Sequence, residues 1–117
     1  MNTKTAILLI DPYNDFLHPE GKLDGMIRDT PVKSKAIEHL HQLISAARSS
    51  GISICYCMHQ QTDEYFAKSW TMMNRTFAGL QSGKAFEAGT QGSEYFGGME
   101  PDIAKGDSVV SKHWNSR

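Results

Sequence analysis

The most constraining feature of the sequence is a short apolar run near its start. Residues 5–10 read Thr-Ala-Ile-Leu-Leu-Ile, without polar alternation. Continuous apolar runs of this length are typical of parallel strands that are covered on both faces. The run ends at Asp11 and Pro12, and a proline has no N–H to donate to a neighbouring strand. The pattern therefore predicts a buried parallel strand near residues 5–10.

A helix is predicted to follow this strand. Thr30 is a favourable N-cap residue, and Pro31 suits the first helical position. Gly51 stands where the C-terminal glycine of such a helix is expected. Between these positions the apolar residues recur at spacings of three and four, as they do on one face of a helix. They are Val32, Ala36, Ile37, Leu40, Leu43, Ile44 and Ala47.

Two more strands complete the predicted fold. Residues 52–57 are rich in β-branched and aromatic side chains, and residues 108–111 form a third short strand. A strand–helix–strand unit pairs its strands in parallel through a right-handed crossover. We therefore expect an α/β fold with a doubly wound, Rossmann-like three-layer parallel sheet, in a single domain over residues 1–117.

The predicted sheet is incomplete, because only one crossover helix accompanies its strands. Parallel sheets are almost always covered on both faces. Three explanations are open: the chain is a fragment, another chain completes the sheet, or the long segment 58–106 covers it. We expect a domain that is truncated on its C-terminal side. Segment 58–106 mixes aromatic residues with glycines and is predicted to form ordered loops, with a short helix around 63–73.

Composition argues against several classes of protein. The chain has 12 Lys and Arg and 13 Asp and Glu residues, whereas a nucleic-acid-binding protein carries an excess of basic residues. No apolar run approaches the roughly 20 residues that a membrane-spanning helix needs. The first residues lack the pattern of a secretory leader, so we expect a cytoplasmic protein that binds neither nucleic acid nor membrane.

The chain has two cysteines, Cys55 and Cys57, which form neither a disulfide framework nor a Cys-x-x-Cys motif. In a cytoplasmic protein we expect both thiols to be reduced. We expect them on opposite faces of the strand over 52–57, unable to bridge each other, and acting as small buried apolar residues.

Charged residues follow two of the predicted strands. Asp11 follows the first strand and Lys112 follows the third. Ligands of doubly wound sheets bind outside the carboxyl ends of the strands, so the two side chains could meet there if the strands are close. A carboxylate beside an ammonium stays ionised, and such a carboxylate could act as the base for a thiol or a water. From spacing alone, a surface ion pair is the commoner arrangement.

Three blocks of the sequence together resemble one known family. Residues 6–17 read Ala-Ile-Leu-Leu-Ile-Asp-Pro-Tyr-Asn-Asp-Phe-Leu, like the opening motif of isochorismatase-like hydrolases. Residues 89–94 resemble the family's Gly-Thr-x-Gly-x-Glu loop, and residues 108–113 resemble the strand that ends in the family's lysine. The order and rough spacing of all three blocks fit the family, and they span nearly the whole chain.

The resemblance implies a catalytic mechanism. Family members fold as doubly wound α/β sheets and use an Asp–Lys–Cys triad to hydrolyse amides or, in some members, the vinyl ether of isochorismate. Carried onto this chain, Asp11 is the general base for the thiol, and Lys112 holds this arrangement and stabilises negative charge. The family's nucleophilic cysteine follows a later strand, beyond Arg117, and Cys55 and Cys57 match no nucleophile motif. We therefore expect residues 1–117 alone to be inactive.

The resemblance also suggests residues that contact the substrate. Phe16 flanks the family's pocket, Trp114 directly follows the lysine block, and Trp70 lies in the variable segment that often shapes the pocket. His59 is interpreted as a pocket or surface histidine that could contact substrate. For each aromatic residue, ordinary core packing is the alternative.

Metal binding is not expected. The nicotinamidase branch of the family holds a divalent metal with an Asp-x-His pattern and a second histidine shortly after. In the matching stretch only His59 fits, because Cys57 replaces the aspartate and Asp63 lies near the second histidine position. We predict neither a metal nor a cofactor.

The sequence favours a cytoplasmic hydrolase that cleaves an amide C–N bond in a small molecule. Its expected partner is a second copy of the chain or a complementing C-terminal chain. The alternative is a non-catalytic ligand-binding or subunit-assembly fragment of the same fold. A flavodoxin-like nucleotide or flavin binder fits the strand–helix–strand pattern less well, because neither strand-to-helix turn carries a glycine-rich phosphate loop.

Overall fold

The computed structural model describes residues 5–28, 33–68 and 70–112. Its strands are β1 (Ala6–Ile10), β2 (Ser53–His59) and β3 (Ser108–Lys112), and its α-helices are α1 (Asn14–Leu17), α2 (Lys33–Ser49) and α3 (Arg75–Ser82). Short 3-10 helices are η1 (Asp24–Met26), η2 (Gln91–Ser93) and η3 (Ile103–Lys105). No helix in these ranges is long and apolar enough to cross a membrane.

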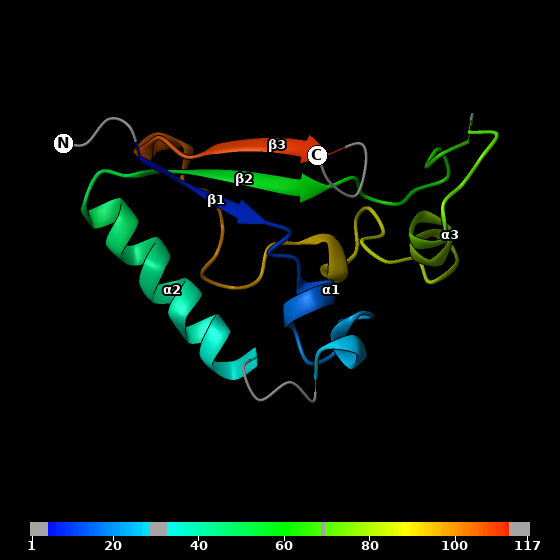
Figure 1. The fold of residues 1–117 in the computed structure, drawn as a ribbon, viewed down its shortest axis with the longest axis horizontal. Helices are drawn as coiled ribbons and strands as arrows, with labels where there is room; N and C mark the ends of the chain where they lie inside the picture. Colours follow the sequence, from blue (N-terminus) through cyan, green and yellow to red (C-terminus); the bar gives the residue numbers. More distant parts are fainter. Residues whose placement is uncertain (1–4, 29–32, 69, 113–117) are drawn as a thin grey trace.

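The three strands form one parallel sheet in the order β1-β2-β3, and they point in the same direction (Figure 1). Ile10 pairs with Cys57, and His59 pairs with Lys112, so the carboxyl ends of the strands meet at one edge. The predicted strands and the parallel α/β fold are confirmed. Parallel pairing requires long crossovers, and α2 supplies the crossover between β1 and β2.

The core lies on one face of the sheet, which α2 covers (Figure 1). Ile44 and Ala47 of α2 are buried against apolar residues of the strands, which include Leu9, Ile54 and Met58. Helix α2 ends where the sequence predicted, because Gly51 follows it with a left-handed φ of 67°. The predicted helix start, at Thr30 and Pro31, lies outside the described residues.

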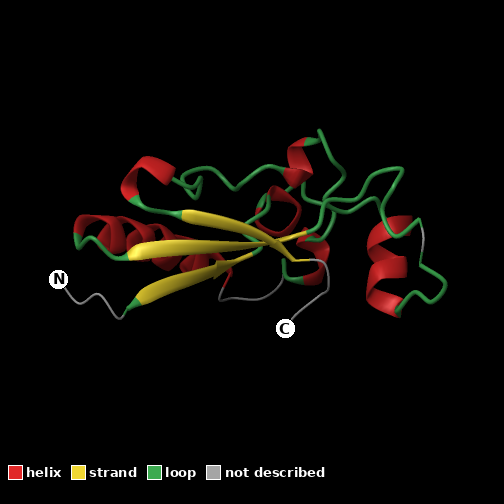
Figure 2. Cartoon of the chain, turned by 90° about the horizontal axis from the view of Figure 1, so that it is seen from above, coloured by secondary structure: helices red, strands yellow, loops and turns green. Residues whose placement is uncertain are grey.

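The opposite face of the sheet carries exposed apolar side chains. Leu8 is 59% exposed, Ile10 57% and Val110 47%. Helices α1 and α2 both lie on the other side (Figures 1 and 2). Within the described residues, β1 is therefore covered on one face only, whereas the sequence predicted cover on both. We call the surface formed by Ala6, Leu8, Ile10, Cys55, Cys57 and Val110 the open face.

The expectation that the two thiols point to opposite faces is wrong. Side chains alternate along a strand, so residues two apart share a face. Cys55 and Cys57 are both partly exposed, whereas Ile54, Tyr56 and Met58 between and beside them are buried. Both thiols therefore lie on the open face, and neither is the fully buried residue that was predicted.

The helix predicted around 63–73 is also wrong. Residues 64–68 form turns, and α3 begins only at Arg75. The Asp63 carboxylate accepts a hydrogen bond from the N–H of Tyr65 at 2.8 Å, which favours a turn over a helix. Asn74 is the N-cap of α3, and its side chain accepts from the N–H of Phe77 at 2.8 Å.

A partly buried ion pair joins the end of α2 to the turn before β3. The Arg48 Nη2 atom donates to Asp107 Oδ2 at 2.7 Å and to the carbonyl of Glu100 at 2.7 Å. The same carboxylate oxygen accepts the N–H of Asp102 at 2.8 Å. Burial raises the pKa of Asp107, but the Asp102 N–H and the Arg48 guanidinium outweigh burial and hold the pKa below its ordinary value of 3.8.

This ion pair gives a prediction for stability. Asp107→Asn should lower the free energy of unfolding at pH 7 by about 2–4 kcal/mol, because Arg48 loses its charged partner. A carboxylate with a lowered pKa stabilises the fold above its unfolded pKa of 3.8, and the contribution disappears as the pH falls through the lower, folded pKa. Urea unfolding should therefore show the variant and the wild type converging below pH 3.8.

The control is Asp102→Asn, which removes a carboxylate from the exposed ion pair with Lys105 and keeps a capping side chain. It should change stability by less than about 0.5 kcal/mol. An equal decrease in the free energy of unfolding in the two variants would contradict a special role for the Arg48–Asp107 pair.

Candidate active site

Asp11 directly follows β1 and has an unusual backbone conformation. Its φ is +51°, in the left-handed region that residues other than glycine rarely adopt. Its N–H donates to the carbonyl of Cys57 at 3.1 Å, and its carbonyl accepts the N–H of Tyr13 at 2.7 Å. Such strain persists only where the surrounding contacts hold the residue in place, and it is concentrated at functional sites.

The Asp11 carboxylate is held by two donors. Lys112 Nζ donates to Oδ2 at 2.6 Å, and the backbone N–H of His59 donates to Oδ1 at 2.6 Å. The side chains of Lys112 and Asp11 are 19% and 17% exposed, so the pair is neither sealed from water nor freely solvated. The predicted contact between Asp11 and Lys112 is confirmed, and the pair lies at the carboxyl edge of the sheet.

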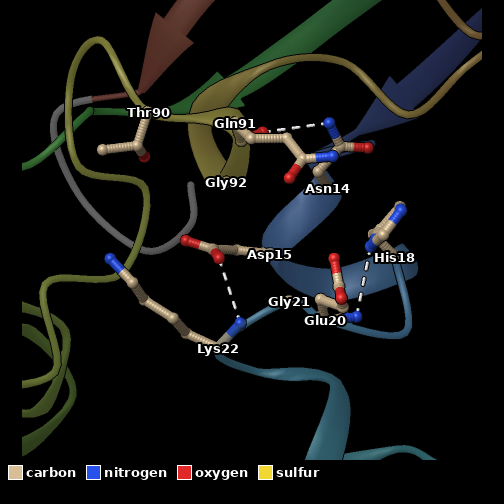
Figure 3. A pocket seen from close by; sticks show the side chains of 9 residues that line it. All are labelled: Asn14, Asp15, His18, Glu20, Gly21, Lys22, Thr90, Gln91 and Gly92. Carbon is tan, nitrogen blue, oxygen red and sulfur yellow. Dashed lines mark hydrogen bonds between the residues drawn. The ribbon is translucent and has the colours of Figure 1, made fainter.

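A second aspartate, Asp15, is fully enclosed. It is 2% exposed, and its two oxygens accept the N–H groups of Lys22 at 3.0 Å and Phe86 at 2.6 Å. The neighbouring Asn14 donates from Nδ2 to the carbonyl of Gln91 at 2.9 Å (Figure 3). The Asn-Asp motif therefore joins the first sequence block to the Gly-Thr-x-Gly loop, a role that the sequence analysis did not assign.

Gly92 allows this close approach between the two blocks. A Cβ atom at residue 92 would overlap the Asp15 carboxylate. A Cβ atom at Gly21 would likewise overlap the backbone carbonyls of Asn14 and Asp15. Both positions therefore have no room for a side chain. In the sequence, the glycine at position 92 of the Gly-Thr-x-Gly-x-Glu block was the one feature that pointed to this contact.

A cavity of about 210 Å³ lies at this junction (Figure 3). Its polar groups already serve the fold, because Asp15 and Asn14 are bonded as described and His18 Nδ1 accepts the N–H of Glu20 at 3.1 Å. We interpret it as a structural crevice. Its lining residues are Asn14, Asp15, His18, Glu20, Gly21, Lys22, Thr90, Gln91 and Gly92.

Three of the four residues predicted to contact substrate lie in one aromatic cluster. Phe86 contacts both Phe16 and His59, with ring centroids 5.2 and 5.3 Å apart. Phe77 in turn contacts His59 at 5.3 Å and Trp70 at 5.1 Å. The cluster thus connects the end of β2 to α3, while contact with a substrate stays a prediction. Trp114, the fourth residue, lies outside the described residues.

A larger cavity of about 380 Å³ lies beside the end of β2 and β3. Tyr13, His59 and Gln60 contribute to its wall, and Gln60 Oε1 is a buried acceptor without a partner among the described residues. The remaining lining residues are Met58, Gln61, Asp63, Ser93, Tyr95, Val109 and Ser111.

The described residues contain no group of three or more His, Cys, Asp or Glu side chains arranged to hold a metal ion. The ring of His59 is buried among aromatic residues, with Nδ1 2.7 Å from the carbonyl of Gln60. That the whole chain needs no metal or cofactor stays a prediction.

Cys57 of β2 does not resemble an activated nucleophile. Burial raises the pKa of the Cys57 thiol above its ordinary value, and a hydrogen bond with the Cys55 thiol raises it further. A thiol with a raised pKa is mostly protonated at neutral pH, whereas the thiolate is the nucleophile. The charge of Lys112 lowers the pKa of Cys57, but by less than burial raises it.

The parallel α/β sheet with an Asp–Lys pair at its carboxyl edge places the chain among α/β proteins of one known family, as comparison with known proteins shows. The Isochorismatase domain model matches residues 5–116, so the chain belongs to the isochorismatase family. Among solved structures it is similar to N-carbamoylsarcosine amidase from Thermoplasma acidophilum, with 25% sequence identity and a TM-score of 0.54. That match covers 92% of this chain and 51% of the amidase chain, so this chain spans about half the length of that relative. No curated protein matched the sequence.

The contact between Gly92 and Asp15 gives a second prediction. Gly92→Ala should destabilise the fold by about 1–3 kcal/mol, because the new methyl group displaces a buried carboxylate that holds two backbone N–H groups. Gly97→Ala is the matched control, since a Cβ atom there meets nothing within 4 Å. Thermal unfolding of both variants measures the difference, and equal melting temperatures would contradict the close packing.

Proposed function

We propose that this chain carries part of the active site of a hydrolase that cleaves an amide C–N bond in a small molecule. The observation that carries the proposal is the 2.6 Å contact between Lys112 Nζ and Asp11 Oδ2 at the carboxyl edge of the sheet. Ligands of open parallel sheets bind at this edge. The similarity to an amidase supports an amide over other substrates.

In the proposed mechanism Asp11 is the general base of an Asp–Lys–Cys triad. It accepts the proton of a cysteine thiol, and the thiolate attacks the carbonyl carbon of the amide. The proton passes to the nitrogen as the C–N bond breaks and the amine departs. Water then cleaves the thioester, which releases the acid and restores the thiol. Lys112 positions the Asp11 carboxylate and offsets negative charge that develops in the site.

The nucleophilic cysteine is proposed to lie outside residues 1–117. Cys55 and Cys57 are within β2 and not beyond its carboxyl end, and the pKa of Cys57 is raised. The amidase that this chain resembles is about twice as long as the matched region. The substrate pocket is proposed to include Phe16, His59, Trp70 and Trp114, since an aromatic lining suits a small, flat substrate.

The triad is tested in the protein that contains the cysteine. Asp11→Asn should lower kcat/KM for small amides by at least about a thousandfold, because the variant cannot accept the thiol proton. Lys112→Met should also lower it. Asp102→Asn is the control, because Asp102 caps η3 ahead of β3 and Asn can accept the same N–H of Lys105. Unchanged activity in Asp11→Asn, measured as amine release, would overturn the proposal.

A further prediction concerns residues 1–117 alone. This polypeptide should release amine no faster than buffer, because it lacks the proposed nucleophile. Intact mass measured under denaturing conditions establishes which polypeptides are present in the sample. Activity from a sample containing only Met1–Arg117, if abolished by Cys57→Ala, would place the nucleophile in β2 instead.

A second candidate function, assembly without catalysis, is favoured by the open face. Leu8 and Ile10 are each more than half exposed, and large apolar patches mark interaction sites. We propose that a second copy of the chain or a complementing C-terminal chain covers this face. The cytoplasmic location expected from the sequence also stays a proposal.

Light scattering tests the assembly. Leu8→Lys should shift the protein towards monomer, because it places a charge on the open face. Ile103→Lys is the matched control, since Ile103 is 64% exposed but lies in η3 and not in a strand of that face. An oligomer that resists Leu8→Lys, or a wild-type monomer, would contradict the proposed interface.

A further inference from the structure

The Asp11–Lys112 pair is part of a closed ring of hydrogen bonds that passes through Tyr13. The Tyr13 hydroxyl donates to the carbonyl of His59 at 2.7 Å, in a contact that joins residues 46 positions apart. The N–H of the same peptide group, on Gln60, donates to the carbonyl of Lys112 at 3.1 Å. Lys112 Nζ then reaches Asp11, which lies two residues before Tyr13.

One peptide group is therefore held at both ends. Its carbonyl is held by Tyr13 and its N–H by the backbone of Lys112. The preceding N–H, on His59, holds Asp11 Oδ1 at 2.6 Å. If this peptide turned, its contact with the Lys112 carbonyl and the His59 N–H that donates to Asp11 would both move.

We propose that Tyr13 is a positioning residue, whose hydroxyl fixes the His59–Gln60 peptide and thereby the relative placement of Asp11 and Lys112. The effect of Tyr13 on catalysis rests on the hydrolase function proposed above. The ring itself depends on the geometry of the folded chain.

The hydroxyl group, and not the ring, is assigned this role. The Tyr13 ring is 3% exposed and stacks on Phe86 with centroids 4.8 Å apart, a packing that phenylalanine could reproduce. The hydroxyl reaches past the apolar core to a carbonyl at the edge of the sheet. Burial, and then the nearby Asp11 charge, raise the pKa of Tyr13, so the hydroxyl remains a donor over the whole physiological pH range.

Hydrogen exchange tests the ring without requiring activity. In Tyr13→Phe, the amides of His59 and Gln60 should exchange roughly fivefold faster, as expected for the loss of a single hydrogen bond. The exchange rate of the Ile54 amide, in the buried part of β2, should change only as much as the free energy of unfolding of the whole chain changes. Tyr56→Phe is the matched control, because the Tyr56 hydroxyl is also hydrogen-bonded but contacts Arg48 at 3.2 Å.

Kinetics in the cysteine-containing protein test the catalytic consequence. Tyr13→Phe should lower kcat by roughly tenfold and change KM by less, because the base is displaced while the side chains that line the pocket are kept. Tyr56→Phe should leave kcat unchanged. Because kcat is referred to the concentration of folded enzyme, a loss of stability alone leaves it unchanged.

The outcomes separate this proposal from the proposed function. Faster exchange at His59 and Gln60 in a protein without amidase activity supports the ring and counts against the hydrolase. Unchanged exchange at both amides in Tyr13→Phe overturns the ring, whatever the activity. Faster exchange with an unchanged kcat in an active enzyme overturns the positioning role.

Discussion

The contact on which the edge of the sheet depends is the one made by the Asp11 carboxylate. Asp11 lies at the end of β1, its Oδ1 accepts an N–H of β2, and its Oδ2 accepts the ammonium of Lys112 at the end of β3. One side chain thus links three strands, although β1 and β3 are not paired with each other. The backbone of Asp11 is held in a left-handed conformation to make this possible, and the surrounding hydrogen bonds offset its cost of about 1–3 kcal/mol.

Two aspartates four residues apart have different roles because their surroundings differ. Asp15 is enclosed, and both of its oxygens accept backbone N–H groups, so its role is structural. Asp11 stays partly accessible and accepts the Lys112 ammonium and the His59 N–H at the carboxyl edge of the sheet, where we propose that the substrate binds. The Asn-Asp motif therefore supports the site indirectly, since it anchors the Gly-Thr-x-Gly loop against the turn that follows β1.

Much of this could be predicted from the sequence, for local reasons. The strands, the course of α2 and its end at Gly51 follow from apolar patterning and turn residues. The meeting of Asp11 and Lys112 follows from parallel pairing, which brings strand ends to one edge. The helix expected around 63–73 failed because the Asp63 side chain forms a turn and Asn74 caps a later helix. Tyr13 was missed because its hydroxyl bonds to a residue 46 positions away.

The sequence by itself determined the parallel α/β fold, the family resemblance and the two charged residues at the strand ends. These are encoded in short stretches, where neighbouring residues set the pattern. Only the tertiary structure decided that Asp15 is buried, that Gly92 must lack a side chain, and that Tyr13 completes a ring around the Asp11–Lys112 pair. Each of these depends on contacts between segments far apart along the chain, and spacing in a sequence does not report distance in space.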